Sequence, residues 1–252
     1  MKEFVNILCL YWIGKFRRGD FCIKDIERLY QSVKKHIDRD FKFYCLTNEK
    51  FEKLPKHVIP IQLDYAWPGW WSKMELFRSD LPKGRILYLD LDSHVIRSLQ
   101  PILDYEGDLV MFDTRIPKKK FEALKKKGWV CRYQNATMLF DSGTACMVEI
   151  YNKFLQSPKS WMRQYRSDQD IMGAWVPNQP TFPNEWMIKL GTIRDYQQPP
   201  DNCIIVTGQT TDGLFRRTDS IPWFEQMARG LTLMRNIPLH NEDQKEQIRT
   251  VM

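Results

Sequence analysis

The chain has 252 residues, 38 of them lysine or arginine and 31 aspartate or glutamate, which gives a net charge of +7. This length is enough for one large α/β domain with a buried core. The positive charge indicates an anionic partner, but no known nucleic-acid-binding motif accompanies it, so we expect no nucleic acid. The apolar run at 5–13 is too short to span a bilayer, and no small-residue cleavage site follows it.

Strand and helix patterns alternate through the first part of the chain. An apolar run at 4–13 predicts a buried strand, and a basic loop at 14–19 follows it. Apolar residues then recur at helical spacing from Ile23 to Ile37, and strands are predicted at 41–46 and 58–63. This alternation is typical of a mainly parallel sheet flanked by helices, with ligands bound at the carboxyl ends of the strands.

Further elements are predicted beyond residue 67. A turn at Pro68-Gly69 and helices at 72–79 and 144–155 are indicated, with strands at 108–113, 136–140 and 203–206. Ser167 is a suitable N-cap for a short helix. The region 177–200 predicts ordered but irregular loops, 222–234 predicts a helix, and the tail after His240 is polar.

The stretch from Arg85 to Ile96 is a strand pattern that runs into two aspartates, Asp90 and Asp92. In an extended chain alternate side chains share a face, which would put Ile86 and Tyr88 on the side of both aspartates. Two carboxylates on one face repel each other and are costly to bury. A divalent cation would resolve this conflict, because carboxylate oxygens suit magnesium and manganese.

The six cysteines are scattered, without a C-x-x-C pair. Cys9, Cys45 and Cys203 lie in strand-like runs, which predicts buried thiols of a reducing compartment and argues against a disulfide framework or zinc site. We therefore expect a cytoplasmic protein. Seven basic residues between 115 and 127 are typical of a solvated surface, or could attract an anionic membrane or phosphorylated acceptor. They are Arg115, Lys118, Lys119, Lys120, Lys125, Lys126 and Lys127.

Four blocks in this sequence resemble nucleotide-sugar-dependent glycosyltransferases with a D-x-D motif, most closely glycosyltransferase family 8 and its bacterial and viral relatives. They are the first strand with its helix, Leu-Tyr-Leu-Asp-Leu-Asp, Asn-Ala and Asp-Gln-Asp, spread over about 5–208. The resemblance implies one Rossmann-like domain of the GT-A type over 1–230. Its donor half would be about 1–115 and its acceptor half about 116–230, with a C-terminal tail at 231–252.

The resemblance also implies roles for the residues of the first blocks. Asp90 and Asp92 would bind Mn²⁺ (or Mg²⁺) and the donor diphosphate, and the metal would act as a Lewis acid on the leaving group. Tyr11, at the end of the first strand, would contact the uracil base. Lys73 would reach the diphosphate or donor sugar, since a point charge suits phosphate.

The later blocks would surround the donor sugar. Asn135-Ala136 resembles the family's Asn-Ala turn, whose asparagine hydrogen-bonds this sugar. Asp168 would hold donor hydroxyls, and Gln169 would lie near the anomeric carbon on the face of retaining chemistry, so these two are the candidate catalytic residues. The resemblance thus implies a metal-dependent hexosyl or pentosyl transferase. It would move a sugar from a UDP-sugar to a glycan, lipid or protein hydroxyl, with retention.

One departure from the family follows its last strand. The family has a histidine there that supplies a third metal ligand, within a His-x-x-Gly-x-x-Lys-Pro-Trp-like segment, but this chain has Thr207. A threonine hydroxyl is a poor substitute for imidazole on manganese. His94, Asp212 or His240 could complete the site, or two carboxylates with water could suffice.

Other interpretations remain open. A phosphohydrolase of the haloacid-dehalogenase type also has an apolar strand ending in D-x-D, although that motif opens its domain and expects threonine or valine where His94 stands. A catalytically silent sugar-nucleotide-binding module would tolerate the missing histidine. Asp168 and Asp170 could simply be helix N-terminal acids. Three tryptophans could form either core or a wall of the sugar pocket, namely Trp67, Trp70 and Trp71.

Overall fold

The computed structural model describes residues 4–14, 21–114, 122–123, 126, 132–189 and 200–208. Its main sheet has six strands in the order β3-β2-β1-β4-β7-β6. The strands are β1 (Val5–Tyr11), β2 (Phe41–Thr47), β3 (Ile59–Gln62), β4 (Arg85–Leu89), β6 (Leu109–Asp113) and β7 (Tyr133–Asp141). Strands β1 to β4 are parallel, whereas β7 is antiparallel to both β4 and β6. The predicted mostly parallel sheet is confirmed.

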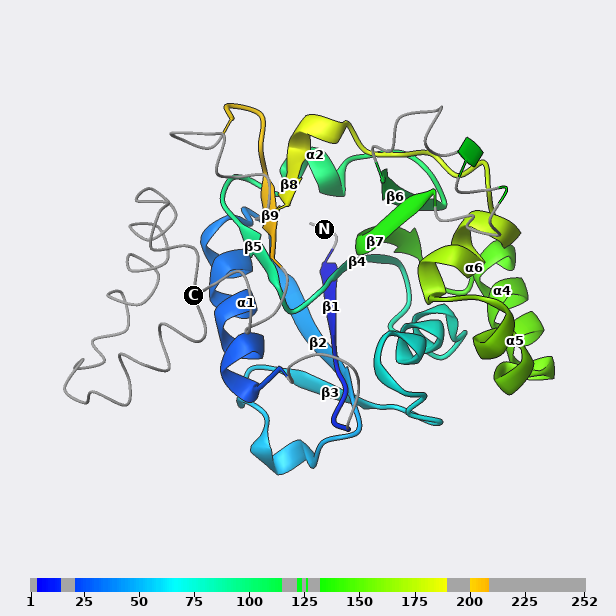
Figure 1. The fold of residues 1–252 in the computed structure, drawn as a ribbon. Coiled ribbons are helices and arrows are strands. Elements are labelled where there is room, and N and C mark those ends of the chain that lie inside the picture. Colours follow the sequence, from blue (N-terminus) through cyan, green and yellow to red (C-terminus); the bar gives the residue numbers. More distant parts are fainter. Residues whose placement is uncertain are drawn as a thin grey trace, which may run out of the picture.

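Helices cover both faces of this sheet (Figure 1). Helix α1 (Ile23–Lys35) buries Ile26, Leu29 and Val33 in the core on one face. The other face is covered by η2 (Gly69–Phe77), α4 (Ala145–Gln156) and α6 (Asp168–Trp175). The shorter helices are η1 (Phe51–Lys53), α2 (Gln100–Leu103), α5 (Pro158–Gln164) and η3 (Asn184–Trp186). A sheet covered on both faces explains why every residue of β1 is buried.

A second, three-stranded sheet has the order β5-β9-β8. Its strands are β5 (Ser93–Val95), β8 (Met187–Lys189) and β9 (Ile205–Thr207). Strand β5 directly follows Asp92, and it pairs antiparallel with β9. The amide of Gly208 donates to the carbonyl oxygen of Asp92 at 2.9 Å. This sheet therefore brings the end of β9 beside the D-x-D motif.

The continuous strand predicted from Arg85 to Ile96 is wrong. Strand β4 ends at Leu89, and the chain then turns, with the Ser93 amide donating to the carbonyl oxygen of Asp90 at 2.9 Å. The turn is needed because the next strand belongs to a different sheet. Asp90 and Asp92 consequently do not share one face of an extended strand.

Two smaller predictions also need correction. The helix predicted at 72–79 is a 3₁₀ helix that begins at Gly69. Asn135 and Ala136 lie within β7 and do not form a turn. Of the two roles left open for the tryptophans, burial favours the core for Trp67 and Trp71, and Trp67 meets Phe154 edge to face with ring centroids 4.8 Å apart.

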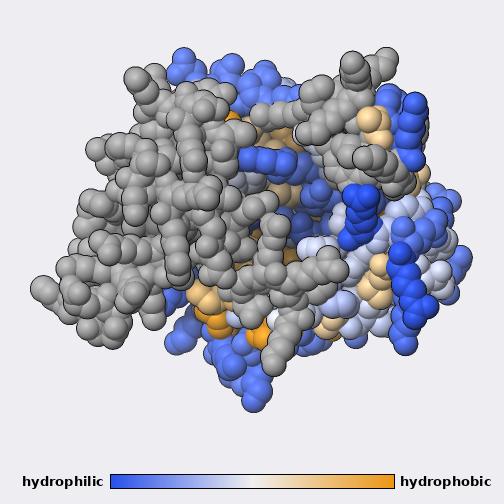
Figure 2. Space-filling view, in the orientation of Figure 1, coloured by the Kyte–Doolittle hydropathy of each residue, from blue (hydrophilic) through white to orange (hydrophobic). Residues whose placement is uncertain are grey.

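The burial predicted for Cys9, Cys45 and Cys203 is confirmed. No helix in the described ranges is long and apolar enough to span a bilayer. On the face drawn in Figure 2, the coloured residues are largely hydrophilic, with small apolar patches. Several predictions fall outside the described residues: the basic run apart from Lys126, the 222–234 helix, the tail, Asp212 and His240.

Candidate functional site

The first aspartate of the motif is held by two donors. The hydroxyl of Tyr88 donates to Asp90 Oδ1, and Lys73 Nζ donates to Asp90 Oδ2 at 2.7 Å. The Asp90 amide in turn donates to the Ala136 carbonyl oxygen at 2.8 Å, which continues the β4–β7 pairing by one residue. Asp90 is thus fixed through its backbone and through both carboxylate oxygens.

The second aspartate of the motif, Asp92, is buried with fewer hydrogen bonds to its carboxylate. Asp92 Oδ1 is shielded from solvent and has no hydrogen-bond partner in the part of the chain that the structure describes. Burial and the nearby charge of Asp90 raise the pKa of Asp92 to about 8, against the opposing effect of Lys73 and Arg28. A buried carboxylate oxygen without a partner is a costly arrangement, which a cation would relieve.

Lys73 is the cation that lies among these carboxylates. Its side chain is 13% exposed, and its ammonium lies 5.7 Å from the centroid of the Tyr88 ring. Burial lowers the pKa of Lys73, but Asp90, Asp168 and Asp92 together outweigh this effect, so its pKa is raised. Lys73 therefore keeps its positive charge within a cluster of three carboxylates.

The 3₁₀ helix that carries Lys73 is fixed by a fully buried glutamate. The Glu75 carboxylate accepts hydrogen bonds from the amides of Asp64, Tyr65 and Ala66 at 2.6, 3.0 and 3.0 Å. Arg78 adds a fourth contact at 3.2 Å. Ala66 has a φ of 46°, a left-handed conformation unusual for alanine, and the three amide contacts hold this turn in place. Glu75 thereby positions Lys73.

The third group is a chain of side chains from β7 and α6. Asn135 Nδ2 donates to Asp168 Oδ2, and Gln169 Nε2 donates to Asn135 Oδ1 at 3.1 Å. Ser167 caps α6 as predicted, because its hydroxyl accepts from the Asp170 amide. Asp170 itself accepts from the Arg166 amide at 3.3 Å, a contact typical of a helix N-terminus.

Asp168 gives a pH-dependent prediction. Its burial, against the effect of Lys73 and Asn135, raises its pKa from 3.8 to about 6, so the ionised form disfavours folding. Its protonated form therefore stabilises the protein at low pH, and this contribution is lost as the pH rises through about 6. Relative to Asp168→Asn, the wild type should lose about 2 kcal/mol of unfolding free energy between pH 4 and pH 7. Urea denaturation of both proteins at each pH tests this, and parallel pH profiles would contradict it.

Two further candidate residues, Tyr11 and His94, lie in strands next to the D-x-D motif, one in each sheet. Tyr11 ends β1, and burial, followed by the charge of Glu49, raises its pKa to about 12. His94 is 3% exposed within β5, and burial lowers its pKa well below the usual range. Within the described ranges, no three His, Cys, Asp or Glu side chains form a metal-binding group, so His94 is not grouped with Asp90 and Asp92 in this structure.

The donor set nevertheless fits a hard divalent cation. Asp90 and Asp92 supply carboxylate oxygens, the ligand type that Mn²⁺ and Mg²⁺ prefer. Asp92 Oδ1, buried and without a hydrogen-bond partner among the described residues, is an oxygen that a bound cation would satisfy. Gly208, the last described residue after β9, lies beside Asp92.

Comparison with known proteins identifies this fold. No protein-family model and no curated protein sequence matches the chain. Among solved structures, the galactosyltransferase LgtC in complex with donor and acceptor sugar analogues matches with a TM-score of 0.64 and 14% identity, over 96% of this chain and 99% of that one. The chain has the GT-A glycosyltransferase fold.

Two other glycosyltransferases share this fold at greater distance. The bifunctional enzyme WbbM matches with a TM-score of 0.61 and 12% identity, over 93% of this chain and 50% of that one. Mouse xyloside xylosyltransferase 1 matches with a TM-score of 0.54 and 13% identity, over 81% and 97%. At such identities the likeness concerns the fold, and function must be argued from the site.

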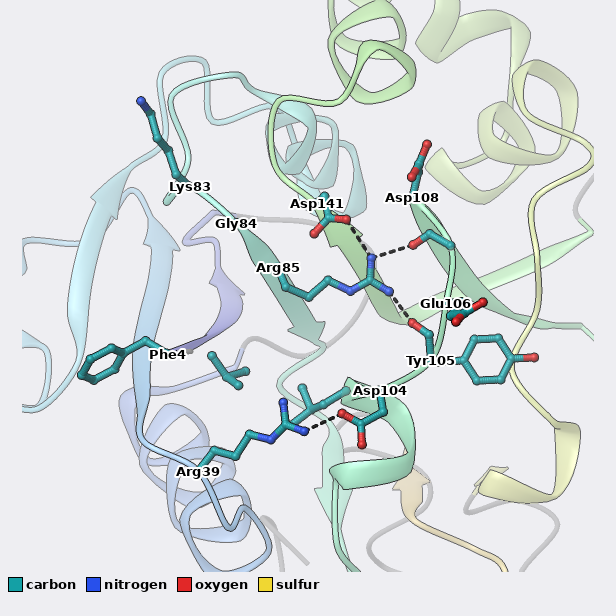
Figure 3. Close-up of a pocket in the computed structure, with 13 residues that line it drawn as sticks. Phe4, Arg39, Lys83, Gly84, Arg85, Asp104, Tyr105, Glu106, Asp108 and Asp141 are labelled. Atoms are coloured by element: carbon teal, nitrogen blue, oxygen red, sulfur yellow. Dashed lines mark hydrogen bonds and ion pairs between the residues drawn. The ribbon is translucent and has the colours of Figure 1, made fainter. Parts of the chain in front are cut away.

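A cavity of about 530 Å³ lies at the opposite end of this glycosyltransferase fold, by the amino ends of β1 and β4 (Figure 3). Arg85 Nη1 there contacts Asp141 at 3.0 Å and the Gly107 carbonyl oxygen at 2.6 Å. Arg39 pairs with Asp104 across the cavity. Because these arginines already bind protein groups, the cavity is a structural feature separate from the candidate site.

Two contributors to the site were missed from the sequence. Tyr88 was placed only on the face of the aspartates, although its position two residues before Asp90 was the signal for their contact. Arg28 donates to the Leu91 carbonyl oxygen at 2.9 Å, inside the turn between the aspartates. No sequence signal marks that contact, because α1 and the turn are 63 residues apart.

Proposed function

We propose that this protein transfers a sugar from a nucleotide diphosphate, with a UDP-sugar as donor, to a hydroxyl group of a glycan, lipid or protein. The observation that carries the proposal is one charged cluster in a glycosyltransferase fold. Lys73, Asp90 and Asp92 meet at the end of β4, and the charge of Lys73 also acts on Asp168. Ligands of doubly wound sheets bind at this edge, outside the carboxyl ends of the strands.

Each group has a chemical task in this proposal. Asp92 and Asp90 would hold Mn²⁺ or Mg²⁺, which when bound supplies Lewis-acid stabilisation of the leaving diphosphate. Lys73 would place its ammonium against the same diphosphate. Tyr11, at the end of β1, would contact the uracil base, and Ala136 would line the donor site.

The chain formed by Asn135, Asp168 and Gln169 would bind the sugar. Its carboxylate and amide groups can accept from and donate to sugar hydroxyls, and Asp168 is oriented by Asn135. Gln169 would lie near the anomeric carbon in a retaining reaction. One matching LgtC structure carries a glutamine-to-glutamate substitution in its active site, which supports an active-site role for a glutamine in this fold.

One specific observation favours a second candidate, a sugar-nucleotide-binding module without catalysis. Thr207 stands where the family has a metal-binding histidine, and within the described residues only two carboxylates lie at the motif. The phosphohydrolase alternative is less well supported, because D-x-D follows the fourth strand of the chain and the fold is that of glycosyltransferases.

A donor screen with Mn²⁺ tests the proposal. We expect the protein to hydrolyse or transfer sugar from at least one UDP-sugar, measured by UDP release, with loss of activity when EDTA removes the metal. UDP binding by calorimetry without turnover on any donor would instead identify the silent module. Cleavage of p-nitrophenyl phosphate with Mg²⁺ and no UDP binding would refute the glycosyltransferase function.

The division of the chain follows the same proposal. Residues 1–115 would bind the donor and residues 116–230 the acceptor, with 231–252 as a tail. The basic residues from 115 to 127, which apart from Lys126 are outside the described residues, could attract an anionic acceptor or membrane. The buried thiols support a cytoplasmic location.

A further inference from the structure

The two aspartates of the motif do not offer equal positions to a cation. Both carboxylate oxygens of Asp90 accept hydrogen bonds, one from Tyr88 and one from Lys73. Asp92 Oδ1, in contrast, has no hydrogen-bond partner among the described residues. A cation that uses both aspartates can therefore bind Asp92 directly, but at Asp90 it meets a position that Lys73 already holds.

Tyr88 restricts how Asp90 can respond. Its side chain is 1% exposed and packs in the core beneath the site, so the hydroxyl has little freedom to move. Each carboxylate oxygen has two acceptor positions, and Tyr88 takes one of those on Oδ1 from within the packed core, which leaves Oδ2 as the less hindered oxygen for a second strong interaction. Lys73 is attached through a long flexible stem on η2, and its ammonium also lies over the Tyr88 ring. The lysine can leave Asp90, whereas the tyrosine stays.

We propose that Lys73 is an internal counter-cation that competes with a divalent metal ion for Asp90 Oδ2, and that Tyr88 enforces this competition by holding Oδ1. The inference rests on the proposed function and assigns an order of binding to the same site. Two cations repel each other at one oxygen, so metal binding at Asp90 requires Lys73 to leave. A nucleotide diphosphate offers Lys73 a new anionic partner, so the metal and the nucleotide bind with positive coupling.

Mn²⁺ titrations followed by electron paramagnetic resonance, without nucleotide, test the competition. Wild type, Lys73→Met, Tyr88→Phe and the double variant form a double-mutant cycle. In the wild-type background, Lys73→Met should tighten Mn²⁺ binding about threefold to fivefold, as expected for a lost ion pair of this kind. In the Tyr88→Phe background Oδ1 is open to the metal, so the same substitution should have little effect.

The cycle separates direct competition from a general effect of charge. Removing a positive charge that acts only at a distance would tighten Mn²⁺ binding equally in both backgrounds, and this result would overturn the inference. Unchanged or weaker Mn²⁺ binding in Lys73→Met would also overturn it. Lys73→Gln provides a second variant if thermal unfolding shows that the methionine variant does not fold.

Addition of UDP completes the test. In wild type, UDP should tighten Mn²⁺ binding. In Lys73→Met, UDP should tighten Mn²⁺ binding less, by about the same threefold to fivefold factor that the substitution produces without nucleotide, because no lysine remains to be displaced. If wild type binds Mn²⁺ and UDP but both variants show the same coupling, the inference fails and the proposed function stands. If wild type binds neither, the proposed function fails, and the inference fails with it.

Discussion

Asp92→Asn is expected to reduce sugar transfer about a thousandfold, because it removes the carboxylate that we propose anchors the cation for the leaving diphosphate. Asparagine retains the shape of the side chain and one oxygen, but it lacks the charge that a divalent cation requires. The variant should fold with at least wild-type stability, since it replaces a buried carboxyl group whose ionised form is disfavoured by burial and by Asp90. UDP release at saturating donor and Mn²⁺ measures the loss, and urea denaturation measures the stability.

The matched control is Asp108→Asn, which makes the same change of charge. Asp108 is exposed and lines the cavity at the opposite end of the sheet. Its activity should remain within about twofold of wild type, as for surface substitutions away from a site. Equal activity of Asp92→Asn and wild type would show that Asp92 is a structural residue of the turn. Equal losses in both variants would point to the net charge of the protein as the cause.

Glu75→Ala is expected to cost about 3–5 kcal/mol of unfolding free energy, because it removes one partner of a buried ion pair and leaves several donors unsatisfied. The carboxylate is fully buried, and it accepts from three consecutive backbone amides as well as from Arg78. Without it, the left-handed turn at Ala66 also loses its support. Chemical denaturation in urea measures the change.

Two further variants show whether the loss of stability in Glu75→Ala comes from its buried contacts. Glu75→Gln keeps the shape and one carbonyl acceptor, so it should lose about half as much stability as the alanine variant. Glu52→Ala removes an exposed glutamate of η1 and should change stability by less than about 0.5 kcal/mol. A loss below 1 kcal/mol in Glu75→Ala would contradict the role of Glu75 as the fixed point of η2.

The buried contacts of Glu75 also affect the candidate site. Lys73 lies two residues before Glu75 on the same 3₁₀ helix, and a 3₁₀ helix has weaker internal hydrogen bonds than an α-helix. The position of the ammonium therefore depends on how firmly Glu75 holds the helix. Partial loss of the Glu75 contacts would move Lys73, which is the only cation that contacts Asp90 within the described residues.

Local patterns in the sequence were sufficient for much of the fold. Periodicity located β1, α1, β2 and α4 to within a few residues, because these elements bury apolar faces at regular spacing. The strand pattern before Asp90 located the motif, and the cap at Ser167 located α6. These features depend on neighbouring residues, so they can be predicted without knowledge of distant contacts.

The sequence by itself therefore determined the class of fold, the D-x-D motif and the set of candidate residues. Only the tertiary structure decided how those residues meet, because their contacts join elements far apart in the chain, such as Asn135 with Asp168. It replaced the extended strand through the motif by a turn between two sheets. It also made the aspartates unequal: Tyr88 and Lys73 engage Asp90, while burial leaves Asp92 Oδ1 with no hydrogen-bond partner within the described ranges.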